Sequence, residues 1–144
     1  KSTLTCAAKT CYDMRITGTV ITGKGEGSTY IARPGYRRQF QRRFGMQPFP
    51  GTLNLKLQGE NVERFRSLQN EPGIQLQSFT DNNQMFGAVS CFPCSVTDAV
   101  EGVVVIPARS TYDDVMEIVA EVCLRNLLGL KDGDKIAVEI RLEV

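Results

Sequence analysis

Residues 50–57 read Pro-Gly-Thr-Leu-Asn-Leu-Lys-Leu, and this stretch decides the fold class. Leucines alternate with polar residues from Thr52 to Leu57, which is the period of a half-buried β-strand. The proline and the glycine before it favour a turn that ends where the strand begins. On such a strand Thr52 and Asn54 point to the same face.

Similar strand-like segments occur on both sides of this stretch. Alternating or β-branched residues predict further strands at Met14–Thr22, Ser28–Ala32, Ile74–Phe79, Gln84–Phe92, Ala99–Ile106 and Lys135–Val144. The turn Asp81-Asn82-Asn83 is expected to join two of them into a hairpin.

Three segments instead carry a helical pattern. Tyr36–Phe44 spaces its aromatic residues four apart and is followed by Gly45 as a cap, and Val62–Leu68 follows Asn61 as a possible N-cap. Tyr112–Leu128 is predicted to be the one long helix, because its apolar residues can share a face. Many short strands with few helices predict a mainly β protein, a small closed or nearly closed β-barrel.

The composition is that of one globular domain. The 144 residues are 42% apolar and 23% charged, and the net charge of +1 provides no general attraction to nucleic acid or to a membrane. No segment reaches the roughly 18 consecutive apolar residues of a membrane helix. Because the chain has no histidine, any reaction must use carboxylates, Lys, Arg, hydroxyls, thiols, backbone groups or a hard cation.

An odd number of cysteines without a signal-peptide pattern predicts free thiols in a reducing cytoplasm. The five are Cys6, Cys11, Cys91, Cys94 and Cys123. The Cys91–Cys94 pair could be redox-active, or could bind zinc with Cys6 and Cys11. The pair lies at the end of a predicted strand, so two small apolar core residues are the favoured interpretation.

The chain begins at Lys1, and residues 1–13 lack the apolar region of a signal peptide. We expect residues 1–13 to be a linker, a cloning remnant or the stub of a preceding domain. Residues 14–144 are expected to form the barrel domain.

A glycine cluster lies between the first two predicted strands. Gly23, Gly25 and Gly27 let the backbone approach a ligand, successive N–H groups can bind phosphate, and Lys24 adds a positive charge. A plain tight turn is the commoner meaning of such a cluster. Residues 18–24 spell the start of a Walker A motif, but position 25 is not Ser or Thr and no helix follows, so that motif is rejected.

Two further groups of side chains could carry chemistry. The oxygens of Thr52 and Asn54 suit Mg²⁺ completed by phosphates and water, although a polar strand face is the simpler interpretation. Glu117 and Glu121 lie four apart on the predicted long helix, where an acidic pair is more often a solvated face. The first predicted helix carries a basic cluster that could meet phosphates or only solvent, with Arg38 and Arg42 on one side. Its members are Arg37, Arg38, Arg42 and Arg43.

In this order the motifs resemble one family closely, the archaeal CTP-dependent riboflavin kinases. The specific part is the pairing of Gly23-Lys24-Gly25-Glu26-Gly27 with residues 50–57. Further matches are Gly35-Tyr36, Gly45–Pro48, Gly102–Pro107, Glu117–Ala120, Leu124-Arg125 and Leu130–Asp134. The resemblance covers about residues 15–142. The stretch between Pro107 and Glu117 aligns only with a small gap, and Glu121 stands where family members often have proline.

The resemblance implies a cradle-loop barrel of about six strands. It also implies a cytoplasmic phosphotransferase that moves the γ-phosphoryl group of CTP to the 5′-hydroxyl of riboflavin, giving FMN and CDP, with Mg²⁺. Because phosphoryl transfer depends mainly on positioning and charge neutralisation, the lack of histidine is no objection.

The family pattern also implies roles for particular residues. The expected nucleotide-binding residues are Lys24, Gly25, Glu26, Gly27, Ser28, Thr29, Val122, Cys123, Leu124 and Arg125. The expected flavin-binding residues are Ser110, Thr111 and Glu117, and the expected magnesium ligands are Thr52 and Asn54. Glu117 is also the candidate that orients the ribityl hydroxyl and accepts its proton.

Two other functions remain open from the sequence. One is a flavin- or nucleotide-binding module without catalysis. The other is a nucleic-acid-binding barrel, because residues 130–136 resemble the Gly-Asp hairpin turn of swapped-hairpin transcription factors. The net charge of +1 argues against the second, so nucleic acid is expected only through a preceding domain, and no membrane partner is expected.

Overall fold

Short strands connected by turns and short helices make up residues 12–23, 31–108 and 114–142, which the computed structural model describes. The strands are β1 Met14–Ile21, β2 Leu53–Lys56, β3 Ile74–Leu76, β4 Phe79–Asp81, β5 Gln84–Phe86, β6 Val89–Val96, β7 Val100–Pro107, β8 Val115–Val119 and β9 Lys135–Ile140. The helices are α3 Pro34–Phe44, α4 Glu60–Gln69 and α5 Leu124–Leu128.

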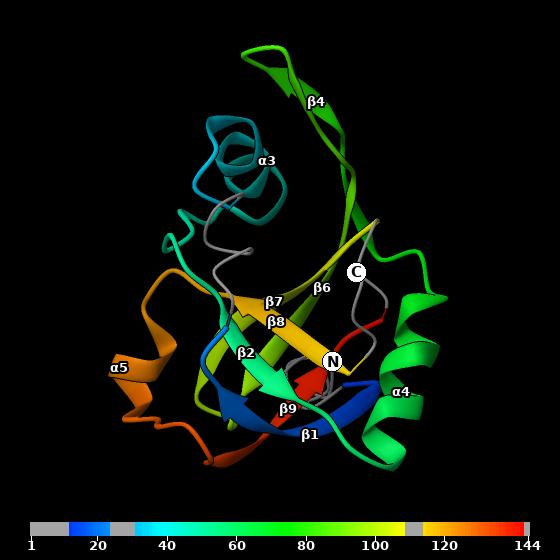
Figure 1. The fold of residues 1–144 in the computed structure, drawn as a ribbon, viewed down its shortest axis with the longest axis vertical. Coiled ribbons are helices and arrows are strands. Elements are labelled where there is room, and N and C mark those ends of the chain that lie inside the picture. The colour runs from blue at the N-terminus through cyan, green and yellow to red at the C-terminus, as the bar shows by residue number, and fades with distance from the viewer. Residues whose placement is uncertain (1–11, 24–30, 109–113, 143–144) are drawn as a thin grey trace, which may run out of the picture.

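Six antiparallel strands close into a barrel, as the sequence predicts. Their order is β6-β7-β8-β2-β1-β9, and a pairing of β9 with β6 joins the two ends (Figure 1). β3 pairs with the part of β6 that β9 leaves open. The mainly β barrel is thus confirmed, and its closure leaves few unpaired strand edges.

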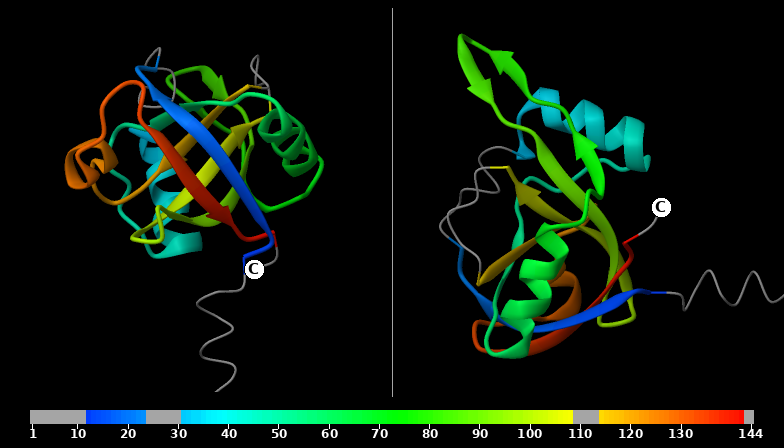
Figure 2. Two further views of the ribbon diagram at one scale, coloured as in Figure 1. Left: turned by 90° about the horizontal axis from the view of Figure 1, so that it is seen from below. Right: turned by 90° about the vertical axis from the view of Figure 1, so that its right-hand side faces the viewer.

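The predicted hairpin around Asn82 and Asn83 forms an arm beside the barrel. Both asparagines have positive φ, 52° and 64°, as the tight turn between β4 and β5 requires. The arm rises from the barrel next to α3 (Figure 2). Gly35 fits against the ring of Phe79, where a Cβ would lie 2.5 Å from the nearest ring carbon.

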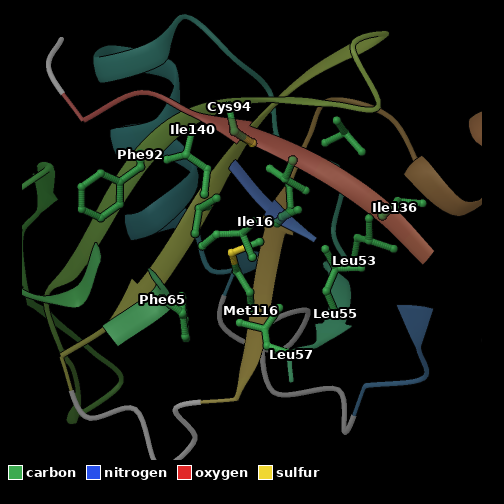
Figure 3. Packing of buried hydrophobic residues seen from close by; sticks show 14 of the residues in the cluster. Ile16, Leu53, Leu55, Leu57, Phe65, Phe92, Cys94, Met116, Ile136 and Ile140 are labelled. Atoms are coloured by element: carbon green, nitrogen blue, oxygen red, sulfur yellow. The ribbon is translucent and has the colours of Figure 1, made fainter. Parts of the chain in front are cut away.

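One apolar cluster fills the barrel interior. Leu55 on β2, Leu57 just after β2 and Met116 on β8 point into it and are at most 1% exposed (Figure 3). Phe65 and Leu68 bring α4 against the same interior. Full burial of such side chains contributes about 1.5–3 kcal/mol each, so this cluster supplies much of the stability of the barrel.

A second apolar cluster lies outside the barrel, between the sheet and α3. Tyr36 and Phe40 come from α3, while Val105 and Val119 come from the outer faces of β7 and β8. α3 begins after Arg33 with Pro34 in its first turn and ends at Gly45, whose φ of 65° confirms the predicted cap. The outer face of the sheet is therefore partly covered.

The prediction of one long helix over Tyr112–Leu128 is wrong. Within the described part of this range the chain forms β8 and then the short helix α5. The longest helix among the described residues is α3, with 11 residues. β8 forms because its β-branched residues pair with β2 on one side and with β7 on the other.

Smaller differences follow from local contacts. Asn61 is not a cap, since α4 begins at Glu60 and the Oδ1 atom of Asn61 accepts a hydrogen bond from the N–H of Thr17 at 2.8 Å. Of the predicted strand Ser28–Ala32, residues 28–30 lie outside the described residues and the remainder is not a strand. None of the helices in the described ranges has the length and apolar character needed to cross a membrane.

The thiols of Cys91 and Cys94 are buried in different clusters. Cys91 belongs to the outer cluster and Cys94 to the inner one, so they lie on opposite faces of β6. Burial raises the pKa of each to about 12, which disfavours the thiolate that metal binding or redox chemistry requires. The core interpretation is therefore favoured, while Cys6 and Cys11 lie outside the described residues.

Candidate functional site

Polar side chains gather on the outer face of the β2–β8 pair. The register sets Asn54 opposite Glu117, and the hydroxyl of Thr52 donates a hydrogen bond to Oε1 of Glu117 at 3.0 Å. All three side chains are partly buried. The prediction that Thr52 and Asn54 share a face is confirmed, and Glu117 joins them from the neighbouring strand.

The start of the glycine cluster lies against the same group. A Cβ on Gly23 would be 2.3 Å from Nδ2 of Asn54, so a larger residue at position 23 would displace the Asn54 side chain. The β1–β2 register leads to the same placement, because Ile21 pairs with Asn54. The described part of this segment therefore ends at Gly23 beside Asn54, while Lys24–Thr29 lie outside the described residues.

The donor set fits a hard cation whose shell is completed by a substrate. Thr52, Asn54 and Glu117 supply a hydroxyl, an amide and a carboxylate, all oxygen ligands of the kind Mg²⁺ accepts. Within the described ranges no group of three or more His, Cys, Asp or Glu residues could hold a metal alone. Magnesium typically keeps waters and takes phosphate oxygens as ligands, which suits this incomplete set.

The predicted acidic pair is separated in the structure. Glu117 lies on a strand instead of a helix, and Glu121 follows β8, where its Oε2 atom accepts a hydrogen bond from the N–H of Gln47 at 3.1 Å. Glu121 thus fixes the loop after α3 and does not join Thr52 and Asn54. The side chains of Arg38 and Arg42 are exposed on α3, as predicted for a solvated helix face.

The predicted nucleotide residues after β8 line a cleft that reaches the polar group. Val122, Cys123, Leu124 and Arg125 share this cleft with Thr52. The cleft also has apolar walls, which include Phe49, Leu53, Ile118 and Ala120. The structure therefore brings two separately predicted parts of the site together.

A second cavity lies at the end of β7, and the sequence reasoning missed it. Its volume is about 310 Å³, and Tyr36, Phe86 and Pro107 are among its lining residues. Glu117 pairs with Val105, and Pro107 lies two residues further along the same face of β7. Ser110 and Thr111 lie outside the described residues but follow this wall of the cavity in the chain.

An aromatic group makes the cavity wall rigid. The hydroxyl of Tyr36 donates a hydrogen bond to the carbonyl of Gly87 at 2.6 Å, and burial raises the pKa of this phenol. The Tyr36 ring meets Phe79 edge-on at 4.7 Å between centroids, and the guanidinium of Arg33 lies 4.9 Å from the centre of the Phe86 ring. The only sequence signal for this cavity was the Gly35-Tyr36 match.

The fold and the site together define a class of protein. It is a small antiparallel β-barrel whose outer face carries a group of oxygen-bearing side chains, with Thr52 at a mixed cleft and a separate apolar cavity near the end of β7. The family model for CTP-dependent riboflavin kinases, described as "Domain of unknown function DUF120", matches residues 20–140. The chain therefore belongs to the CTP-dependent riboflavin kinase family.

Curated relatives from archaea carry the name riboflavin kinase. The chain is 43% identical over 130 residues to the one from Pyrobaculum calidifontis, covering 90% of this chain and 61% of that protein. It is 42% identical over 130 residues to the one from Archaeoglobus fulgidus, covering 90% and 55%. The chain thus spans somewhat more than half the length of these relatives.

Proposed function

We propose that this chain transfers the γ-phosphoryl group of CTP to the 5′-hydroxyl of riboflavin, giving FMN and CDP, with Mg²⁺. The observation that carries the proposal is the position of the Thr52–Asn54–Glu117 group. Thr52 lines the cleft of residues 122–125, and Glu117 pairs with Val105, two residues along β7 from Pro107 in the wall of the apolar cavity. A nucleotide in the cleft and a flavin in the cavity would then meet near these oxygens.

On the donor side, Val122–Arg125 would hold the nucleotide base, and the backbone of residues 24–29 would hold the phosphates. Gly23 supports this division, because its close approach to Asn54 brings the start of the glycine-rich segment next to a proposed metal ligand. Thr52 and Asn54 would bind Mg²⁺, which neutralises phosphate charge as the phosphoryl group moves.

On the acceptor side, the apolar cavity would take the flavin ring. Its volume is at the lower end of the range for small-molecule sites, and its aromatic wall offers a rigid surface to a planar ring. The ribityl chain would then run along β7 toward Glu117, with Ser110 or Thr111 contacting it. Glu117 would orient the 5′-hydroxyl and accept its proton.

We also propose that the reaction takes place in the cytoplasm. Cys91, Cys94 and Cys123 are free thiols, as expected of a reducing compartment.

The proposal is tested by incubating the purified chain with riboflavin, Mg²⁺ and one of CTP, ATP, GTP or UTP, and separating the flavins by chromatography. FMN formed with CTP and much less with ATP would establish the reaction and the donor together. FMN formed with ATP alone would keep the kinase and overturn the role of residues 122–125. Binding of riboflavin and CTP without FMN, in folded protein, would identify a non-catalytic binding module.

A further inference from the structure

The turn of residues 131–134, between α5 and β9, is fastened to the end of β1. The N–H of Gly133 donates to the carbonyl of Val20 at 2.8 Å, and the N–H of Val20 donates to the carbonyl of Asp134 at 2.8 Å. The carboxylate of Asp134 accepts a hydrogen bond from the N–H of Lys131 at 2.8 Å, which closes the turn. Gly133 has a φ of 100°, a conformation that glycine adopts without strain.

This rigid turn presents the carboxylate of Asp132 to two other segments. Its Oδ2 atom accepts a hydrogen bond from the hydroxyl of Thr22 at 2.8 Å. Its Oδ1 atom accepts a hydrogen bond from Nη1 of Arg125, also at 2.8 Å. One side chain thus joins residues that are about a hundred positions apart in the sequence.

The two partners of Asp132 belong to different parts of the proposed nucleotide site, the glycine-rich segment and the cleft of residues 122–125. Thr22 directly precedes Gly23, the residue whose backbone passes against Asn54. Arg125 lies on α5 and lines the cleft that contains Thr52. The two halves have no sequence continuity, so a common anchor would fix their relative position.

Stability alone does not account for this arrangement. The side chain of Asp132 is 56% exposed and that of Arg125 is 35% exposed. Exposed ion pairs of this kind contribute little to folding, because solvent screens them. The hydrogen bonds from Thr22 and Arg125 lower the pKa of the Asp132 carboxyl, so it is ionised at neutral pH. An ionised carboxylate with one oxygen for each partner is suited to orienting both.

We propose that Asp132 is a positioning residue for the nucleotide. It holds the guanidinium of Arg125 in the cleft and the end of β1 at the start of the glycine-rich segment, and does not itself touch the nucleotide. This inference rests on the proposed function, because it assumes that both segments bind the same donor molecule.

The test measures CTP affinity by calorimetry, together with the KM values for CTP and riboflavin, in Asp132→Ala and Asp132→Asn. Asp132→Ala is expected to weaken CTP binding and raise the KM for CTP by about tenfold, the effect expected when one hydrogen bond to a charged group is lost. The KM for riboflavin and the thermal unfolding midpoint should stay unchanged. Asp132→Asn keeps an oxygen that can accept the hydrogen bond from Thr22, so its loss of CTP affinity should be smaller.

A matched control, and a test of Asp132→Ala in a doubly substituted background, separate positioning from general charge. Glu139→Ala removes a carboxylate that pairs with Arg15 at 3.4 Å across β1 and β9, and should leave the KM for CTP unchanged. In a Thr22→Val/Arg125→Met background, adding Asp132→Ala should have almost no further effect on CTP affinity, because both of its partners are gone.

Three outcomes would overturn the inference. Unchanged CTP affinity in both Asp132 variants would show that the carboxylate positions nothing. Equal losses for CTP and riboflavin, together with a lower unfolding midpoint, would reduce Asp132 to a structural residue. If the unmutated chain fails to bind CTP at all, the proposed function is overturned and this inference with it, a result easily told apart from the other two.

Discussion

Where Asn54 pairs with Glu117, the two faces of the β2–β8 pair have opposite chemistry although they share a backbone. On the inner face Leu53, Leu55 and Ile118 are at most 3% exposed and fill the barrel. On the outer face Asn54 lies opposite Glu117, at the proposed site. Neighbouring residues on one strand therefore serve different purposes, since the inward side chains stabilise the barrel and the outward ones form the proposed site. A register slip of a single residue would exchange the two faces.

The largest effect is expected on the inner face. Leu55→Ala should lower the free energy of unfolding by about 2–5 kcal/mol, because it leaves a cavity among fully buried neighbours. Urea unfolding followed by circular dichroism measures the change. Leu127→Ala is the control, since that side chain is 58% exposed and its loss should cost about 0.5 kcal/mol or less. Equal costs in the two variants would contradict the assignment of the inner face.

On the outer face the same type of change should affect turnover and leave stability nearly intact. Asn54→Ala is expected to reduce kcat by about 100-fold and to raise the Mg²⁺ concentration for half-maximal rate by at least about tenfold. A magnesium titration of the initial rate measures both. If the variant keeps the magnesium dependence of the unmutated chain, Asn54 is not a metal ligand.

Glu117→Gln should distinguish proton transfer from binding. The amide retains the size of the carboxylate but cannot accept a proton, so turnover should fall by about 100-fold or somewhat less. Riboflavin affinity, measured by the quenching of flavin fluorescence, should change only slightly. Intact turnover in this variant would exclude Glu117 as the base. Its remaining role would be to orient Thr52, from whose hydroxyl it accepts a hydrogen bond at 3.0 Å.

The same comparison shows how far the sequence could lead. The strand at residues 53–56 and the shared face of Thr52 and Asn54 could be predicted, because alternation is a local property of the chain. Residues 115–119 could not, because their apolar residues fit a helical face as well as a strand. Pairing with β2 and β7, which lie far away in the sequence, decides between the two.

The apolar cavity lined by Tyr36, Phe86 and Pro107 was missed for a related reason. It forms where the β4–β5 arm folds against α3 and the end of β7, three segments that no local pattern connects. The family resemblance supplied Glu117 despite the wrong secondary structure, since a motif match does not depend on the backbone conformation. The hydrogen bond to Thr52 then gives Glu117 a physical place in the site.

The smallest effect is expected at the far end of the same outer face. Lys56 donates a hydrogen bond to the carboxylate of Asp114, and the two side chains are 44% and 34% exposed. Since solvent screens such a pair, Lys56→Met should cost at most about 1 kcal/mol of stability and leave magnesium dependence unchanged. It is thus a matched control for Asn54→Ala, because Lys56 lies two residues along the same strand face.

The pH dependence of the stability loss in Lys56→Met shows whether the ion pair with Asp114 causes it. The hydrogen bond from Lys56, aided by the attraction between the charges, lowers the pKa of the Asp114 carboxyl below its ordinary value of 3.8. A lowered pKa in the folded state stabilises the protein above the ordinary value, and this contribution is lost as the pH falls through the folded pKa. The stability difference between the unmutated chain and Lys56→Met should therefore be constant near neutral pH and shrink in acid. A difference that persists below the folded pKa would assign the effect to packing of the lysine stem.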